Sequence, residues 1–183
     1  MRPSTGGAEH TVQFYDRPAS LAHRVADFAA AGLERGETAI MIATAEHRMA
    51  TEGRLVALGI DLGAATADGR YLPFDAAQML DRILIDGRPD PARFDEVVGT
   101  IVRRAQRSRP GVRAFGEMVG LLWSDGKHDA AMALEDLWNE LLGHHPFSLM
   151  CGYPARRLSF GGSGLARIVD AHTDVARGAL TPS

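Results

Sequence analysis

Two kinds of apolar pattern alternate along this chain. Uninterrupted apolar runs, such as TAIMIAT at residues 38–44, are typical of strands that are buried on both faces of a parallel sheet. Between these runs, apolar residues recur at the spacing of an amphipathic helix, as at Leu134, Trp138 and Leu141. The pattern predicts strands at residues 11–15, 38–44, 70–74, 112–115 and 147–152, and helices at residues 20–35, 46–58, 76–85, 92–108, 127–142 and 165–177.

Strands and helices alternate almost throughout the chain, and this order favours βαβ units. The fold class that we predict is therefore α/β, with a mainly parallel sheet and helices on both of its faces. In sheets of this kind, ligands bind beyond the carboxyl ends of the strands. Candidate site residues are accordingly those that come just after each predicted strand.

Aromatic and acidic residues follow several of these strands. We expect a ligand site that is lined by Tyr15, Asp16, Glu117, Trp123 and Tyr153. The rings would form apolar walls, and Glu117 would accept one hydrogen bond, which suits a small and largely apolar ligand. Two simpler interpretations stay open, because Glu117 could bond only to neighbouring backbone and the rings could only fill the core.

Length and composition exclude several classes of protein. The chain has 183 residues, of which 45% are hydrophobic and 23% charged, as in an ordinary globular protein. We expect a single domain at residues 9–177, between loose tails at residues 1–8 and 178–183. The formal charge of −3 does not suit a nucleic-acid-binding surface, and no apolar run is long enough to span a membrane. The single cysteine excludes an internal disulfide and fits a reducing cytoplasm.

The motifs of common enzymes are missing from this sequence. A phosphate-binding loop needs glycines and a lysine between the first strand and the first helix, but residues 15–20 read YDRPAS. The sequence contains neither GxSxG nor HExxH, and Cys151 lies in an apolar run, which indicates a buried structural thiol. We therefore expect no catalytic residues, no metal site and no cofactor.

The C-terminal part of the chain leaves two questions open. The glycine-rich residues 161–164 form either a hinge before the last helix or an anion-binding turn. The last helix, at residues 165–177, is either an output element that docks on a partner or a helix that packs on the sheet.

Several segments together resemble a known family of sensory domains. Residues 28–46 carry the pattern F-x-x-x-G-L-x-x-G-E before an apolar strand, which is similar to RecA-like ATPases of the KaiC type. Combined with the missing phosphate loop, this pattern resembles the MEDS domain, the methanogen/methylotroph sensory domain of a dichloromethane-responsive regulator. The resemblance runs over residues 9–176 and also rests on HTVQFYD at residues 10–16, FGEM at 115–118 with Trp123, LEDLWN at 134–139, LMCGYP at 149–154 and His172.

The resemblance implies a RecA-like sheet with a degenerate phosphate loop and a function without catalysis. A member of this family would be a cytoplasmic sensory module that binds a small ligand, such as one of hydrocarbon type. It would pass a conformational signal to a partner such as a histidine kinase or a transcription factor, and it could form a homo-oligomer. Two alternatives stay open: a degenerate nucleotide-binding protein without ATPase activity, and a protein-interaction scaffold.

Overall fold

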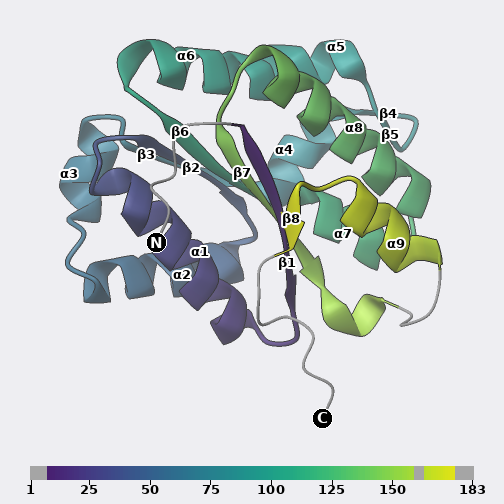
Figure 1. Ribbon diagram of the computed structural model, residues 1–183, viewed down its shortest axis with the longest axis horizontal. Helices are drawn as coiled ribbons and strands as arrows, with labels where there is room; N and C mark the ends of the chain where they lie inside the picture. The colour runs from purple at the N-terminus through teal and green to yellow at the C-terminus, as the bar shows by residue number, and fades with distance from the viewer. Residues whose placement is uncertain (1–7, 159–162, 176–183) are drawn as a thin grey trace.

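One parallel sheet forms the centre of the molecule (Figure 1). The computed structural model describes residues 8–158 and 163–175. Within these residues six strands pair side by side in the order β3-β2-β6-β7-β1-β8, and every pair is parallel. The architecture is a RecA-like α/β fold, as the sequence predicted. The strands are β1 (Glu9–Tyr15), β2 (Thr38–Ala43), β3 (Tyr71–Asp75), β6 (Val112–Gly116), β7 (Ser148–Pro154) and β8 (Asp174–Val175).

Helices cover both faces of the sheet (Figure 1). The first face is covered by α1 (Pro18–Leu33), α2 (Ala45–Ala57) and α3 (Leu62–Ala67). The second face is covered by α4 (Ala76–Ile83), α5 (Pro91–Phe94), α6 (Thr100–Ser108), α7 (Met118–Ser124), α8 (His128–His144) and α9 (Ser163–Asp170). A small hairpin of β4 (Leu84–Ile85) and β5 (Arg88–Pro89) follows α4, and a π-helical turn (Asp95–Gly99) joins α5 to α6. No helix among the described residues is long and apolar enough to cross a membrane.

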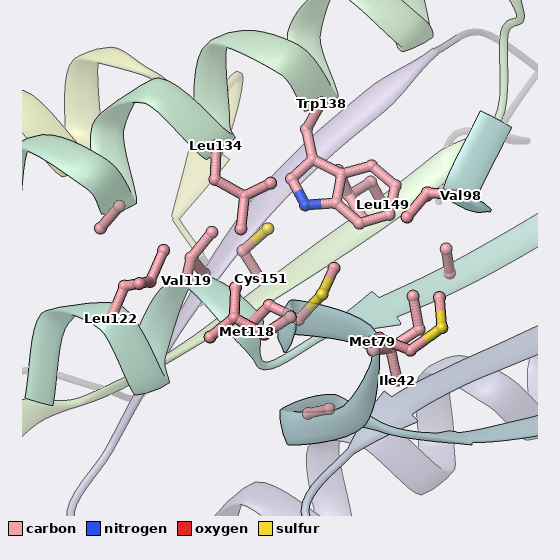
Figure 2. Packing of buried hydrophobic residues seen from close by; sticks show 14 of the residues in the cluster. Ile42, Met79, Val98, Met118, Val119, Leu122, Leu134, Trp138, Leu149 and Cys151 are labelled. Atoms are coloured by element: carbon pink, nitrogen blue, oxygen red, sulfur yellow. The ribbon is translucent and has the colours of Figure 1, made fainter. Parts of the chain in front are cut away.

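The apolar runs are buried on both sides because side chains alternate between the two faces of each strand. In β2, Ile40 and Ile42 join the core of the second face, whereas Met41 joins the core of the first face. Figure 2 shows part of the second-face core, in which Leu134 and Trp138 of α8 reach toward the sheet. The sheet is thus shared between two hydrophobic cores.

Polar side chains start several helices directly after a strand or a turn. The Thr44 hydroxyl accepts a hydrogen bond from the His47 backbone N–H at the start of α2 (3.4 Å). The carboxylates of Asp61, Asp75 and Asp90 accept in the same way at the starts of α3, α4 and α5. These caps satisfy backbone donors that the first helical turn leaves free, so local sequence sets where each helix begins. Two of them, Thr44 and Asp75, lie at the carboxyl ends of β2 and β3.

Several elements of the structure differ from the sequence prediction, among them the helix predicted at residues 92–108, which is divided into α5, the π-helical turn and α6. Helices α3 and α7 were not predicted. Most of α7 is buried, so its apolar residues form a run without visible helical spacing. The predicted helix at residues 165–177 ends at Asp170, and strand β8 then pairs with β1. The predicted tails, apart from residue 8, and part of the glycine-rich residues 161–164 lie outside the described residues.

Candidate functional site

Glu117 connects three strands at the carboxyl edge of the sheet. It follows β6 directly, and its side chain is buried. Its Oε2 atom accepts a hydrogen bond from the backbone N–H of Thr44, just after β2, at 2.8 Å. Its Oε1 atom faces Nδ1 of His47 in the first turn of α2 and the hydroxyl of Tyr15 at the end of β1, which lies 3.4 Å away. We call Tyr15, His47 and Glu117 the edge cluster.

The electrostatics of the edge cluster keep Glu117 surrounded by donors. The hydrogen bond to Glu117 raises the pKa of His47, so the imidazole holds its Nδ1 proton toward the carboxylate. Burial, together with the nearby charge of Glu117, raises the pKa of Tyr15, which therefore remains a neutral hydroxyl. Three of about four acceptor positions of the carboxylate are thus occupied, and about one is left for a further donor.

A hollow of about 260 Å³ lies beside the edge cluster, between the end of β1 and the start of α1. Tyr15, Asp16 and Gln13 line it together with residues of the first turns of α1. Gln13 is only 5% exposed, and its Nε2 atom donates to the carbonyl oxygen of Phe14 at 2.6 Å. Its Oε1 atom has no hydrogen-bond partner among the described residues. A buried acceptor without a donor is unfavourable, so this oxygen would gain from any donor that reached it.

The five residues predicted to line one site lie in two places. Tyr15 and Glu117 meet in the edge cluster, and Asp16 is exposed at the adjacent hollow. Trp123 and Tyr153 instead belong to the core of the second face, where their ring centroids are 5.9 Å apart. These five residues therefore do not line one common cavity. A ligand-binding role of each residue stays a prediction.

Strand register explains this separation. Tyr153 is paired with Phe14 between β7 and β1, so both side chains point to the second face. Tyr15 is one residue further along β1 and therefore points to the first face, where it packs against that core. Both tyrosines come at the ends of their strands, but one residue of register places their rings on opposite faces.

His47 is a member of the edge cluster that the sequence prediction did not select. The sequence did place residues 44–47 after a strand, and so at this edge of the sheet. The pattern did not single out the histidine within the first turn of the following helix. A titratable side chain that follows a strand by a few residues is the signal that could have found it.

A second polar cluster lies inside the molecule, on the second face of the sheet. It contains His10 of β1, Glu135 of α8, Cys151 of β7 and His172, which follows α9. Nε2 of His10 lies 3.3 Å from Oε2 of Glu135 and 3.3 Å from Sγ of Cys151. Nε2 of His172 lies 3.4 Å from Oε1 of Glu135. We call these four residues the interior cluster.

The interior cluster is shielded from solvent, and its ionisable groups interact strongly with one another. The side chains of Glu135 and His172 are fully buried, and that of His10 is 1% exposed. Burial by itself raises the pKa of Glu135, but the interactions with His10 and His172 outweigh it and lower the pKa to about 2. Glu135 is therefore an anion in the protein interior. Burial and the charge of Glu135 raise the pKa of the Cys151 thiol well above its usual value.

Sequence reasoning did not find the interior cluster. Its members come from four segments, and none of them forms a local motif of metal ligands. Cys151 was interpreted as a structural thiol, and it is indeed buried. One signal was available, because each of the four residues lies in a segment that carries the family resemblance.

Comparison with known families agrees with that resemblance. The family model described as MEDS, the methanogen/methylotroph, DcmR sensory domain, matches residues 9–173. The match covers β1 through the segment that follows α9, and it includes both polar clusters. No curated protein matches this chain.

Proposed function

Because this chain belongs to the MEDS family of sensory domains, we propose that it binds a small ligand at the carboxyl edge of its sheet and signals to a partner. The partner would be a regulator such as a histidine kinase or a transcription factor in the cytoplasm. The chain would act without catalysis.

The observation that carries this proposal is the edge cluster beside the hollow. Parallel α/β sheets bind ligands at the carboxyl ends of their strands, and here that edge holds a buried carboxylate with acceptor capacity left. The hollow is lined by Tyr15 and by Gln13, whose buried Oε1 has no hydrogen-bond partner among the described residues. Such a site suits a small molecule that combines an apolar part with one hydrogen-bonding group.

The same residues offer a route by which a ligand could change the shape of the protein. Tyr15 ends β1, just before α1, and His47 lies in the first turn of α2. A ligand that competes for Glu117 would release one of these contacts and shift the layer formed by α1 and α2. Helix α2 exposes Met49 and Val56, which are 68% and 60% accessible and lie seven residues apart on one side of the helix. A partner that contacts this side would detect the shift.

Ligand binding can be tested with small alcohols, which carry an O–H donor for Glu117, using NMR of the full chain that follows both the ligand and the protein signals. At least one compound is expected to bind and to shift the Tyr15 and His47 resonances. Glu117→Gln should weaken its affinity by about 10-fold or more, because a hydrogen bond to a charged group is lost. The exposed Glu96→Gln should leave binding unchanged.

Two outcomes would contradict the proposed binding of a small ligand at this edge. One is binding that survives both Glu117→Gln and Tyr15→Phe, which would place the ligand elsewhere. The other is tight binding of ATP in a parallel calorimetric titration, which would favour the degenerate nucleotide-binding alternative. Phosphate release from ATP above the rate in buffer, lost in Glu117→Gln, would contradict a function without catalysis.

A further inference from the structure

The interior cluster has the composition and geometry of a metal centre. We propose that His10, Glu135, Cys151 and His172 bind one divalent first-row transition-metal ion, with zinc as the best match to this donor set. This inference goes beyond the proposed function and does not rest on it, because the interior cluster and the edge cluster lie on different faces of the sheet.

Hydrogen bonds outside the cluster point both imidazoles toward its centre. Asn139 donates its amide N–H to the carbonyl oxygen of Ala171, so its Oδ1 atom faces Nδ1 of His10 at 2.8 Å. Nδ1 of His172 faces the carbonyl oxygen of Ile168 at 2.6 Å. Both partners are acceptors, so each Nδ1 carries a proton, and each Nε2 is the atom left for the centre. Metal-binding histidines are held in this way by an acceptor on the other ring nitrogen.

The four atoms that would bind the metal then face one another around a common centre. Nε2 of His172 has no hydrogen-bond partner among the described residues, although its side chain is fully buried. It faces a carboxylate, and a neutral Nε2 without a proton is an acceptor as well. Two acceptors at this distance need a cation between them, which is either an extra proton on the imidazole or a metal ion.

The charges favour a metal ion over extra protons. Protonating both imidazoles would place two cations in rings whose centroids are only 4.0 Å apart. A single divalent ion instead carries a charge of +2, which equals and opposes the combined charge of the Glu135 carboxylate and a Cys151 thiolate. The thiol proton is released to solvent when the metal binds. The buried centre is then electrically neutral, which avoids the cost of burying an unpaired charge.

Two of the distances between the ligand atoms equal those of a four-coordinate site, whereas Sγ of Cys151 lies 3.3 Å from Nε2 of His10 and would have to move outward. In a tetrahedral zinc site, two nitrogen or oxygen ligands lie about 3.3 Å apart, and about 3.6 Å separates sulfur from either of them. The distance from Nε2 of His10 to Oε2 of Glu135 is 3.3 Å, and the distance from Sγ of Cys151 to the same oxygen is 3.6 Å. All four donor atoms lie within 4.8 Å of one another. Only small movements are needed to close the site around an ion.

Four protein ligands leave no open position for a substrate, so the ion would hold the fold together. The Tyr153 hydroxyl donates to Oε1 of Glu135 at 2.7 Å and supports the carboxylate from outside. His172 comes from the segment that follows α9, and the adjacent Thr173 exchanges hydrogen bonds with the backbone of His10. A bound ion would therefore fasten the end of the domain to β1, β7 and α8.

Cobalt provides a direct test because the chain contains one cysteine. The full chain, purified without a metal-affinity tag and stripped with a chelator, is titrated with Co²⁺ and then with Zn²⁺. We expect one equivalent of Co²⁺ to bind, to produce a thiolate-to-cobalt absorption band that only Cys151 can generate, and to be displaced by Zn²⁺. A folded protein that gives no such band, and that holds no stoichiometric metal as purified, would overturn the proposal and leave a proton-bridged ion pair.

Variants separate the centre from other metal-binding residues. Cys151→Ser should abolish the band, and Asn139→Ala, which removes the support of His10, should weaken Zn²⁺ binding by about 10- to 100-fold. The exposed His23→Gln is the matched control and should bind as the wild type does. Unchanged Zn²⁺ affinity in both Cys151→Ser and His172→Gln would overturn the proposal. Circular dichroism confirms that each variant is folded, and the cobalt spectrum of the wild type needs no variant.

The test is independent of the ligand experiment. Glu117→Gln should retain the cobalt band, whereas Cys151→Ser should retain binding at the edge cluster if it folds. In the wild type, absence of the band with intact ligand binding would contradict only the metal centre. In the wild type, absence of ligand binding with an intact band would contradict only the proposed function.

Discussion

At the scale of single residues, the pair of His47 and Glu117 controls the edge cluster. Glu117 is buried and His47 is 8% exposed, so their interaction is only weakly screened by solvent. The contact also ties the first turn of α2 to the end of β6. The protonation of His47 therefore affects both the stability of the fold and the state of the ligand site.

We predict that this pair makes stability depend on pH. The hydrogen bond to Glu117 raises the pKa of His47 above its ordinary value of 6.5, so the folded protein binds this proton more tightly than the unfolded chain does. The stabilisation is complete below pH 6.5 and is lost as the pH rises through the folded pKa. Relative to His47→Gln, the wild type should gain about 1–3 kcal/mol in free energy of unfolding at low pH and less at high pH.

Urea unfolding across this pH range, with an NMR titration of the imidazole, measures both quantities. The exposed His23→Gln serves as the control, because its difference from the wild type should not follow the same curve. An NMR midpoint for His47 at or below 6.5 would show that the interaction does not raise its pKa.

At the scale of elements, a glycine permits the close approach of α7 to β7. A Cβ atom at Gly120 in α7 would lie only 2.4 Å from the backbone oxygen of Gly152 in β7. This contact sets the position of the helix that carries Trp123 and directly follows Glu117. A small residue is therefore required here for packing.

We predict that Gly120→Ala destabilises the protein by about 1–3 kcal/mol, because backbone must shift to make room for the methyl group. The matched control is Gly143→Ala in α8, where an added Cβ atom meets no atom within 4 Å. That substitution should stabilise the protein by about 0.5–1 kcal/mol, since alanine favours the helix. Chemical unfolding measures both changes, and equal effects of the two variants would refute the packing argument.

At the scale of the whole molecule, the two hydrophobic cores share the strands of one sheet. Leu55 of α2 belongs to the first-face core, whereas Trp123 and Trp138 both belong to the second-face core. Neither core can lose its packing without disturbing strands that the other core needs. We therefore expect both layers to unfold together as the single domain that the sequence predicted.

Leu55→Ala tests this coupling. The substitution empties a fully buried position and should cost about 2–5 kcal/mol. The unfolding midpoint from tryptophan fluorescence, which reports the opposite face, should fall together with the midpoint from far-UV circular dichroism. Val56→Ala, at the neighbouring exposed position, should change stability by less than about 0.5 kcal/mol. Separate transitions for the two signals would show that the faces unfold independently.

The sequence alone determined the fold class, most elements and the family. Apolar runs and helical spacing are local properties, so strands such as β2 and helices such as α8 could be recognised without the rest of the molecule. The alternation of strands with helices then implied a parallel sheet. The same rule predicted that Tyr15 and Glu117 end at one edge, where they do meet. Buried α7 was missed, because a helix that is apolar on most sides has no pattern to distinguish it from a strand.

Only the tertiary structure decided which face of the sheet each side chain reaches. Tyr15 and Tyr153 both end strands, but a shift of one residue reverses the direction of a side chain, and sequence patterns do not locate strand ends that closely. The interior cluster depended on the fold even more strongly. His10 and Cys151 are 141 positions apart, and they meet only because β1 and β7 are neighbours in the sheet. Which strands become neighbours depends on how all the helices pack, and no local pattern contains that information.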